Sequence, residues 1–215
     1  TTEGVHIHII DAELMGKGEK EKKDLYIEGI QNNGIINHYE YIINSEGTIE
    51  IRHVLKPEGK MPLWFPRIGL TLTVSDALDQ VKWYGRGPQE NYPDRKTGYP
   101  TGIYASTVQA MYEPYLMPQD YGLRTDVRWL QLTTDKGIGL QFKMNEWFNF
   151  NIYPYSTDNL TKAMYTYQLQ KQKGMTLNLD YATTGVGCTA RGVFGAYKAM
   201  PQEYRRTISI RPMMK

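Results

Sequence analysis

Five acidic side chains are the residues of this sequence best suited to general acid and base chemistry. They fall between positions 90 and 126, as Glu90, Asp94, Glu113, Asp120 and Asp126. Two carboxyl groups about 5 Å apart would support hydrolysis of a glycoside with retention of configuration. Sequence spacing alone places no two of these groups in such a pair. Three arginines in the same region favour ion pairs instead: Arg86, Arg95 and Arg124.

Histidine and cysteine side chains give weaker signals. His6 and His8 share one face of a predicted strand, a spacing that can chelate a metal ion. No third His or Cys ligand lies nearby, since the remaining histidines are His38 and His53, and the sequence therefore predicts no metal site. Cys188 has no histidine near it in the sequence to act as a base. It is predicted to be a small buried side chain in a tight turn.

Composition indicates a single domain over residues 1–215. Of the 215 residues 40% are apolar, and single all-β units reach this size. The net charge of +2 is spread along the chain, which argues against a nucleic-acid partner, and no apolar run is long enough to cross a membrane. The single cysteine excludes an internal disulfide and leaves the compartment, cytoplasm or periplasm, undecided.

Alternating apolar and polar residues dominate the chain and must form the elements that position these groups. The pattern predicts strands over 5–10 and 25–30, and hairpins around the turn sequences NSEG and TDKG. Only 158–170 is expected to be helical, with Asp158 as its cap, and 104–126 is expected to be irregular. The sequence therefore predicts an all-β, antiparallel architecture, with two packed sheets and long loops.

The stretch VKWYGRGPQENYPDR (81–95) holds too many glycines, prolines and charges for an ordinary helix or strand. Together with MYEPYLMPQDYGLR (111–124), it resembles the C-terminal domain of the large β-galactosidases of glycoside hydrolase family two, also called the small chain. Similar runs upstream and downstream extend the resemblance over most of the sequence. The resemblance implies a β-supersandwich of the galactose mutarotase-like kind, in a fragment that lacks its first strands.

In that family the catalytic glutamates lie in a TIM barrel, as do the ligands of magnesium and sodium ions. The resemblance therefore implies that this chain holds no catalytic residue and no metal site. It implies as partner the barrel of the same polypeptide, in a homo-oligomeric parent that hydrolyses terminal β-D-galactosides such as lactose. The chain would then be an accessory domain at the active-site entrance, inactive on its own.

The resemblance also indicates which loop would line that entrance. In well-known members a glycine-rich segment leads to a Trp that stacks on the sugar, and the matching segment here is GVGCTARG (185–192). The Trp position falls at Gly192, beside Arg191, so the stacking ring is missing. Arg191 can hydrogen-bond a hydroxyl or a carboxylate there, or face solvent.

The turn GPQENYPDR is interpreted as a structural signature near a domain interface, with Pro88 and Pro93 fixing the backbone. Its charged side chains are secondary candidates for sugar or interface contacts, namely Arg86, Glu90, Asp94 and Arg95. Two alternatives stay open. A non-catalytic carbohydrate-binding module would use the 17 tyrosines and 4 tryptophans to stack on galactosides. A mutarotase-like epimerase is disfavoured, because all four histidines lie in the first 53 residues.

Overall fold

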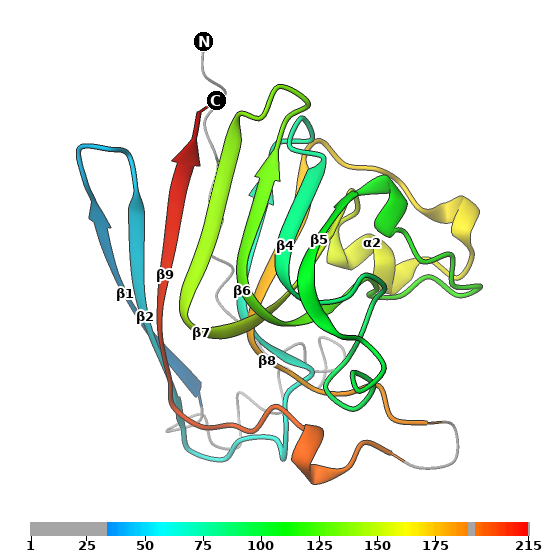
Figure 1. Cartoon of the computed structure of the whole chain (residues 1–215). Helices are drawn as coiled ribbons and strands as arrows, with labels where there is room; N and C mark the ends of the chain where they lie inside the picture. Colours follow the sequence, from blue (N-terminus) through cyan, green and yellow to red (C-terminus); the bar gives the residue numbers. More distant parts are fainter. Residues whose placement is uncertain (1–33, 189–191, 215) are drawn as a thin grey trace.

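A computed structural model describes residues 34–188 and 192–214, and these residues form nine strands with little helix (Figure 1). The strands are β1 (Gly34–Ile43), β2 (Ile49–Glu58), β3 (Arg67–Val74), β4 (Gln80–Arg86), β5 (Thr101–Thr107), β6 (Arg124–Thr133), β7 (Gly139–Tyr153), β8 (Met175–Thr183) and β9 (Tyr204–Met213). The helical segments are α2 (Thr157–Lys162) and three short 3-10 turns, η1 (Gln109–Met111), η2 (Thr166–Gln168) and η3 (Gly195–Tyr197).

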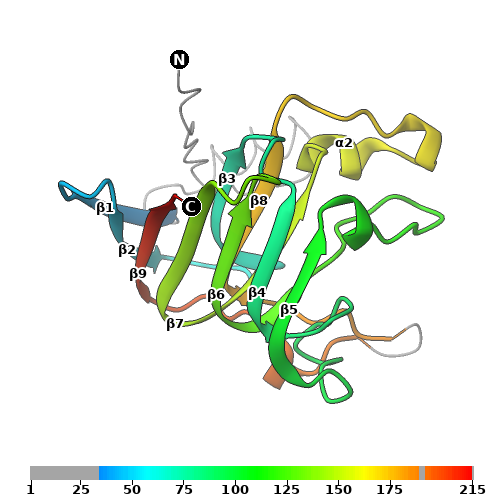
Figure 2. The ribbon, with the colours of Figure 1, turned by 45° about the horizontal axis from the view of Figure 1, so that its top comes forward.

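The strands form one curved antiparallel sheet that folds over on itself without closing into a barrel. Its main path runs β1-β2-β9-β7-β6-β4-β5. The long strand β7 causes the fold-over, because Gly139–Met144 pairs with β9 whereas Asn149–Tyr153 pairs with β8. Strand β3 then pairs with β8. As Figure 2 shows, β3 and β8 lie behind β6 and β4 and form a second layer.

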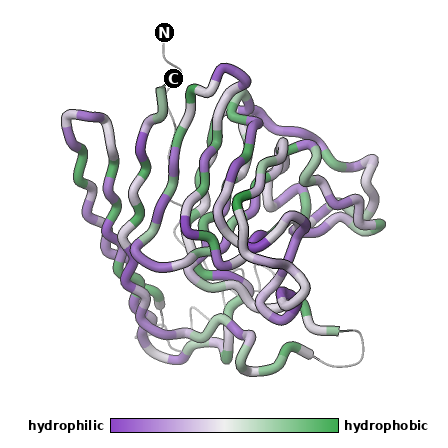
Figure 3. The backbone as a smooth tube through the Cα atoms, in the orientation of Figure 1, coloured by the Kyte–Doolittle hydropathy of each residue, from purple (hydrophilic) through white to green (hydrophobic). Residues whose placement is uncertain are grey.

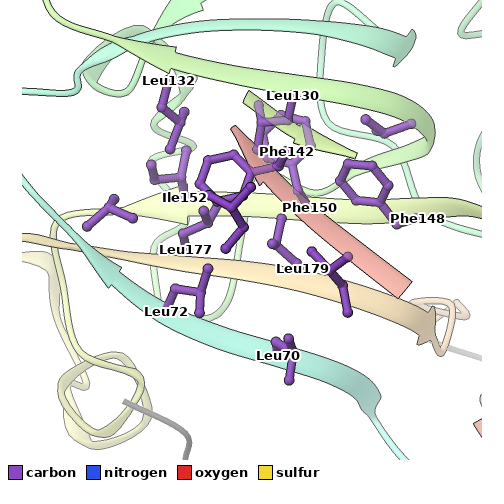
Figure 4. Packing of buried hydrophobic residues seen from close by; sticks show 14 of the residues in the cluster. Leu70, Leu72, Leu130, Leu132, Phe142, Phe148, Phe150, Ile152, Leu177 and Leu179 are labelled. Atoms are coloured by element: carbon purple, nitrogen blue, oxygen red, sulfur yellow. The ribbon is translucent and has the colours of Figure 1, made fainter. Parts of the chain in front are cut away.

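The core lies between these two layers and is built from alternate residues of the strands. Figure 3 shows hydrophobic and hydrophilic residues alternating along them. Leucines of β3 and β8 face the phenylalanines of β7 and the leucines of β6 (Figure 4): Leu70, Leu72, Leu177, Leu179, Phe142, Phe148, Phe150, Leu130 and Leu132. All of these side chains are buried. Each contributes about 2 kcal/mol through the hydrophobic effect.

The predicted all-β, antiparallel architecture is confirmed, and so are both hairpins. At the turn NSEG the side-chain oxygen of Asn44 accepts hydrogen bonds from the backbone N–H groups of Glu46 and Thr48, each 3.0 Å. The turn TDKG closes with a bond from Gly137 N to Thr134 O. The strands predicted over 5–10 and 25–30 lie outside the described residues.

Two predicted boundaries were wrong. The helix expected over 158–170 spans only Thr157–Lys162, and its cap is Ser156, whose hydroxyl accepts from Asn159 N at 3.0 Å. Asp158 lies inside the first turn instead. Part of the segment expected to be irregular forms β5, because Thr101–Thr107 adds to the edge of β4. No helix among the described residues is long and apolar enough to cross a membrane.

A buried histidine joins β2 to the second layer. His53 is inaccessible to solvent and stacks on Tyr39, with ring centroids 4.1 Å apart. The side-chain oxygen of Asn37 lies 3.0 Å from Nε2 and can only accept a hydrogen bond, so Nε2 carries the proton. Nδ1 then accepts from the Tyr181 hydroxyl at 2.7 Å. Burial lowers the pKa of His53 from 6.5 to about 4, because a charged ring would lose its hydration.

The burial of His53 predicts a pH dependence of stability. Since its pKa is lower in the folded chain, the neutral ring stabilises the fold above pH 6.5, and this contribution is lost as the pH falls toward about 4. Between pH 7 and pH 4 the native chain should lose about 3 kcal/mol more unfolding free energy than His53→Gln. Urea denaturation measures this, with exposed His38 replaced by Gln as the control. Equal losses in the native chain and in His53→Gln would contradict the interpretation.

Candidate functional site

The stretch 81–95 begins within β4, and its residues 87–95 form the turn that follows this strand. Trp83 is buried, and its indole N–H donates to Arg86 O at 3.0 Å. The Gly87–Pro88 peptide bond is cis. A Cβ on Gly87 would lie 2.9 Å from the ring of Tyr104 and 3.0 Å from that of Trp83, so glycine is needed there because the two aromatic rings approach the backbone closely.

Glu90 is the buried centre of this turn, with 6% of its surface exposed. Its carboxylate accepts hydrogen bonds from four donors: Tyr92 Oη, Arg95 Nη2, Tyr115 Oη and Gly122 N. Burial is the largest cause that raises the pKa of Tyr115 to about 12, and the hydrogen bond to the Glu90 carboxylate is the second. The phenol therefore stays protonated and donates its hydrogen to Glu90. Glu90 therefore holds the turn together and presents no free carboxylate to a substrate.

Arg86 has a similar local role on the other side of the turn. Its Nε donates to Asp126 Oδ2 at 2.5 Å, and its Nη1 donates to the backbone oxygens of Lys96 and Tyr99. Lys96 Nζ also binds Asp126, at 2.8 Å. Burial alone would raise the pKa of Asp126, but the hydrogen bonds from Lys96 and Arg86 outweigh it and lower that pKa. Two cations thus neutralise this carboxylate.

Asp94 makes the contact that connects this turn to the glycine-rich loop. Its Oδ1 accepts from Val186 N at 3.1 Å and its Oδ2 from Gly187 N at 2.7 Å. One carboxylate therefore binds two successive backbone N–H groups that are more than 90 residues away in the sequence. We call this contact the Asp94 clamp.

Two glycines shape the loop around the Asp94 clamp. A Cβ on Gly185 would lie 2.3 Å from Asp94 Cγ, and Gly187 has φ +67°, in the left-handed region. The base of the loop is fixed as well, because Gly185 N donates to Tyr197 O at 2.8 Å. Thr184 Oγ1 donates to Phe65 O at 2.5 Å and accepts from Ala199 N at 2.9 Å.

The far end of the loop is only partly described. Gly192 is exposed, and a Cβ there would meet no heavy atom within 4 Å. Arg191 lies outside the described residues, so its predicted role stays a prediction. Cys188 was predicted to be buried, and this was wrong: it is exposed, because the loop that carries it leaves the sheet edge after Thr184.

Of the predicted contact residues, the structure brings Glu90 and Arg95 together as an ion pair of 3.1 Å. Arg95 also lies over the ring of Tyr92, 5.4 Å from its centroid. Arg86 pairs with Asp126 instead, and Asp94 binds the loop. The four candidates therefore belong to three separate contacts within one turn.

The sequence analysis missed a buried polar network. It lies on the side of β3, β8 and the end of β7 that points away from the apolar core. Arg67 Nη2 donates to Asp180 Oδ2 at 2.8 Å and to Asn151 Oδ1 at 3.2 Å, and Nη1 reaches Asp120 at 3.4 Å. Asn178 Nδ2 donates to Asn151 Oδ1 at 2.8 Å. Polar residues alternate with core residues in NFNIY and TLNLD, and this pattern could have revealed the network.

The pKa shift and the hydrogen bonds in this network indicate a structural role and not a catalytic one. Burial raises the pKa of Asp180 to about 6, against the opposing effect of Arg67. Its Oδ2 is bound by Arg67 and by Thr183, and Asp120 Oδ1 is bound by Arg67 and Asn151. Each of the two carboxylates is thus engaged with an arginine and a neutral donor. In the part of the chain that the structure describes, no three His, Cys, Asp or Glu side chains are grouped to hold a metal ion.

Fold and loop together define an antiparallel β-sandwich domain that projects a clamped loop from one end. The chain matches the family described as the β-galactosidase small chain over residues 6–210, and it belongs to that family. The resemblance found in the sequence is confirmed.

Curated relatives support this assignment. The chain is 38% identical over 147 residues to a β-galactosidase of Priestia megaterium. The matched residues are 68% of the chain and 14% of that protein. It is 39% identical over 122 residues to a β-galactosidase of Vibrio cholerae (57% and 11%) and 33% identical over 159 residues to one of Pseudoalteromonas haloplanktis (72% and 14%). The matched segments are 11–14% of the length of these relatives.

Removal of the Asp94 carboxylate should loosen the loop without unfolding the domain. A hydrogen bond to a charged acceptor contributes about 2 kcal/mol, so amide exchange at Val186 and Gly187 should accelerate roughly 30-fold in Asp94→Ala. Amide exchange with mass spectrometry measures this change, and Asp135→Ala at a hairpin tip is the control. Unchanged exchange at both amides would show that the clamp does not restrain the loop.

A methyl group at Gly185 should have the same effect by a different route. Gly185→Ala places Cβ against Asp94 Cγ and must displace the carboxylate, whereas Gly192→Ala meets open space. We expect Gly185→Ala alone to lose roughly 1–3 kcal/mol, which is the cost of overpacking. The loss should appear in the unfolding free energy or in the protection of the loop amides against exchange. Thermal denaturation and amide exchange of the pair test this, and equal behaviour would contradict it.

Proposed function

We propose that this chain is an accessory domain of a β-galactosidase and that the glycine-rich loop, which begins at Thr184 and is clamped at Val186 and Gly187, lines the active-site entrance of that enzyme. The observation that carries the proposal is the Asp94 clamp. Two N–H donors, a steric requirement for glycine and a fixed loop base hold residues 184–187 in place, at a cost in conformational entropy. A segment held so tightly suits the positioning of residues at a site on another part of the enzyme.

Three carboxylates of the chain support a non-catalytic role. Retaining hydrolysis needs one carboxyl group free to donate a proton and one free to attack. Glu90, Asp126 and Asp180 are each bound by an arginine and by further donors. Hydrolysis, with the magnesium and sodium ions implied by the resemblance, is therefore proposed for the remainder of the enzyme, of which the chain is one part.

An exposed apolar patch beside the loop base suggests where the catalytic part packs. It consists of Leu63, Trp64, Phe194, Tyr197 and Met200, whose exposed fractions range from 38% to 85%. The bridge between Phe65 and Ala199 holds its two segments side by side. Interfaces between permanently associated parts are apolar in this way. We propose that this patch covers the barrel next to the entrance, in an enzyme that is itself a homo-oligomer.

Substrate contacts follow from the same arrangement. We propose that the enzyme acts on terminal β-D-galactosides such as lactose, and that Arg191 beside Gly192 hydrogen-bonds the aglycone in place of a stacking ring. An arginine favours polar or anionic groups over an apolar face. The expected consequence is an altered preference for the aglycone.

A carbohydrate-binding module remains the second candidate, and one observation favours it. Tyr165 and Tyr167 stack with ring centroids 5.4 Å apart and are 56% and 80% exposed, so they offer aromatic faces to a sugar. Calorimetry with galactose, lactose and galactan separates the candidates. An accessory domain predicts no binding by the chain alone, whereas heat that disappears in Tyr167→Ala would favour the module.

The accessory role predicts different behaviour for the chain and for the complete enzyme. The purified chain should not hydrolyse o-nitrophenyl β-D-galactoside, whereas the enzyme that carries it should. In that enzyme, Asp94→Ala should raise the KM for lactose about tenfold, which corresponds to roughly 1.4 kcal/mol of lost positioning, with Asp135→Ala as the control. Turnover by the chain alone, or a KM unaffected by Asp94→Ala, would argue against the proposal.

A further inference from the structure

A second unusual surface covers the outer face of the sheet, away from the loop. Tyr84 on β4 pairs with Ile103 on β5 and with Trp129 on β6, and Trp147 follows on β7. Ile103 and Trp147 are 61% and 60% exposed. Large exposed side chains gathered on one face mark an interaction surface. We call this surface the basic aromatic face.

Arg128 is the fixed centre of the basic aromatic face. The pairing of β6 with β7 shifts register between Val127 and Trp129, and the guanidinium of Arg128 lies between two rings. Its carbon is 4.0 Å from the centroid of Trp147 and 5.1 Å from that of Tyr84. Nη1 donates to Asp126 O. No carboxylate among the described residues pairs with this arginine, so an ordered cation keeps donors for a partner.

The charges near Arg128 that have no ion-pair partner among the described residues are positive. Lys82, Lys143 and Arg211 are exposed and point to the same side, since Lys143 pairs with Trp129, Lys82 with Gln131, and Gln141 with Arg211. The structure shows no ion pair for any of the three within its described residues. The carboxylates on this side of the sheet are already paired. Lys96 and Arg86 neutralise Asp126. Glu40 and Glu50, on the neighbouring strands β1 and β2, both pair with Arg52. Two copies placed face to face would therefore repel each other.

We propose that the basic aromatic face docks against an acidic surface in the rest of the β-galactosidase polypeptide. The inference rests on the proposed function, and it adds a second contact to the apolar patch beside the loop. The relatives that the chain matches are about seven times longer than the matched segments, so most of such an enzyme lies elsewhere. Trp, Tyr and Arg are the residues that dominate interface energies.

The geometry determines the chemistry of the partner. A carboxylate can accept two parallel hydrogen bonds from the Arg128 guanidinium, and the flanking rings keep water away from that pair. Lys82, Lys143 and Arg211 lie around this centre and would attract further carboxylates. Pre-ordering of Arg128 between the rings lowers the entropy cost of binding. We therefore expect one buried carboxylate at the centre and acidic residues at the rim.

Zero-length carbodiimide cross-linking tests the proposal on the native protein that carries this chain, purified from its source. We expect Lys82 or Lys143 to be joined to a carboxylate of the same enzyme outside this 215-residue segment. Lys136, at the tip of the β6–β7 hairpin, is the control and should not be joined to it. Absence of such a link, or links only between two copies of the basic aromatic face, would overturn the proposal.

Substitutions separate this inference from the proposed function. In the same protein, Arg128→Glu and Trp147→Ser should each lower the yield of the cross-link at least tenfold, whereas Lys136→Glu should not. Lactose hydrolysis measured in parallel tests the proposed function by itself. If the enzyme hydrolyses lactose and the link is absent, only the docking proposal fails. Retention of the native chain on an anionic polysaccharide, lost in Trp147→Ser, would identify a glycan as the occupant and overturn the protein partner.

Discussion

The candidate site depends on the burial of one charged group, the carboxylate of Glu90. Removing a carboxylate from water costs several kcal/mol unless donors replace the lost hydration. Glu90 receives them from three separate parts of the chain: Tyr92 and Arg95 in its own turn, Tyr115 after η1, and the backbone of Gly122 before β6. Because Asp94 lies in the same turn, the position of the clamp follows from the burial of Glu90.

The bent strand β7 provides the second constraint. It belongs to both layers, so the apolar core and the polar network lie on opposite faces of the same strand. Phe148 and Phe150 point into the core, whereas Asn149 and Asn151 join the network. The two faces are coupled, since a shift in register by one residue would exchange them. The network thus specifies the pairing of β7 with β8, and through β8 the start of the loop after Thr183.

Local features of the fold and several residues of the site were predictable, whereas the contacts that join those residues were not. The hairpin at Asn44 follows from a side chain that bonds its own turn, which is a short-range effect. The cap of the helix was wrong because Ser156 and Asp158 are both acceptable caps, and only packing decides between them. The clamp joins Asp94 to Val186 and Gly187 through a fold-over of the sheet that no local pattern encodes. Cys188 was misplaced for the same reason, since burial at a loop depends on where the sheet ends.

Buried acidic groups and exposed apolar or cationic groups differ in how far other residues of this chain contact them. Inside, the buried acids Glu90 and Asp180 each accept several hydrogen bonds and are not available to a substrate. Outside, large apolar side chains and the stacked guanidinium of Arg128 are left in water, where they stabilise the domain little. An enzyme active alone would show the reverse, with perturbed and available groups in a cleft. This distribution supports the proposal that the domain functions in contact with a larger protein.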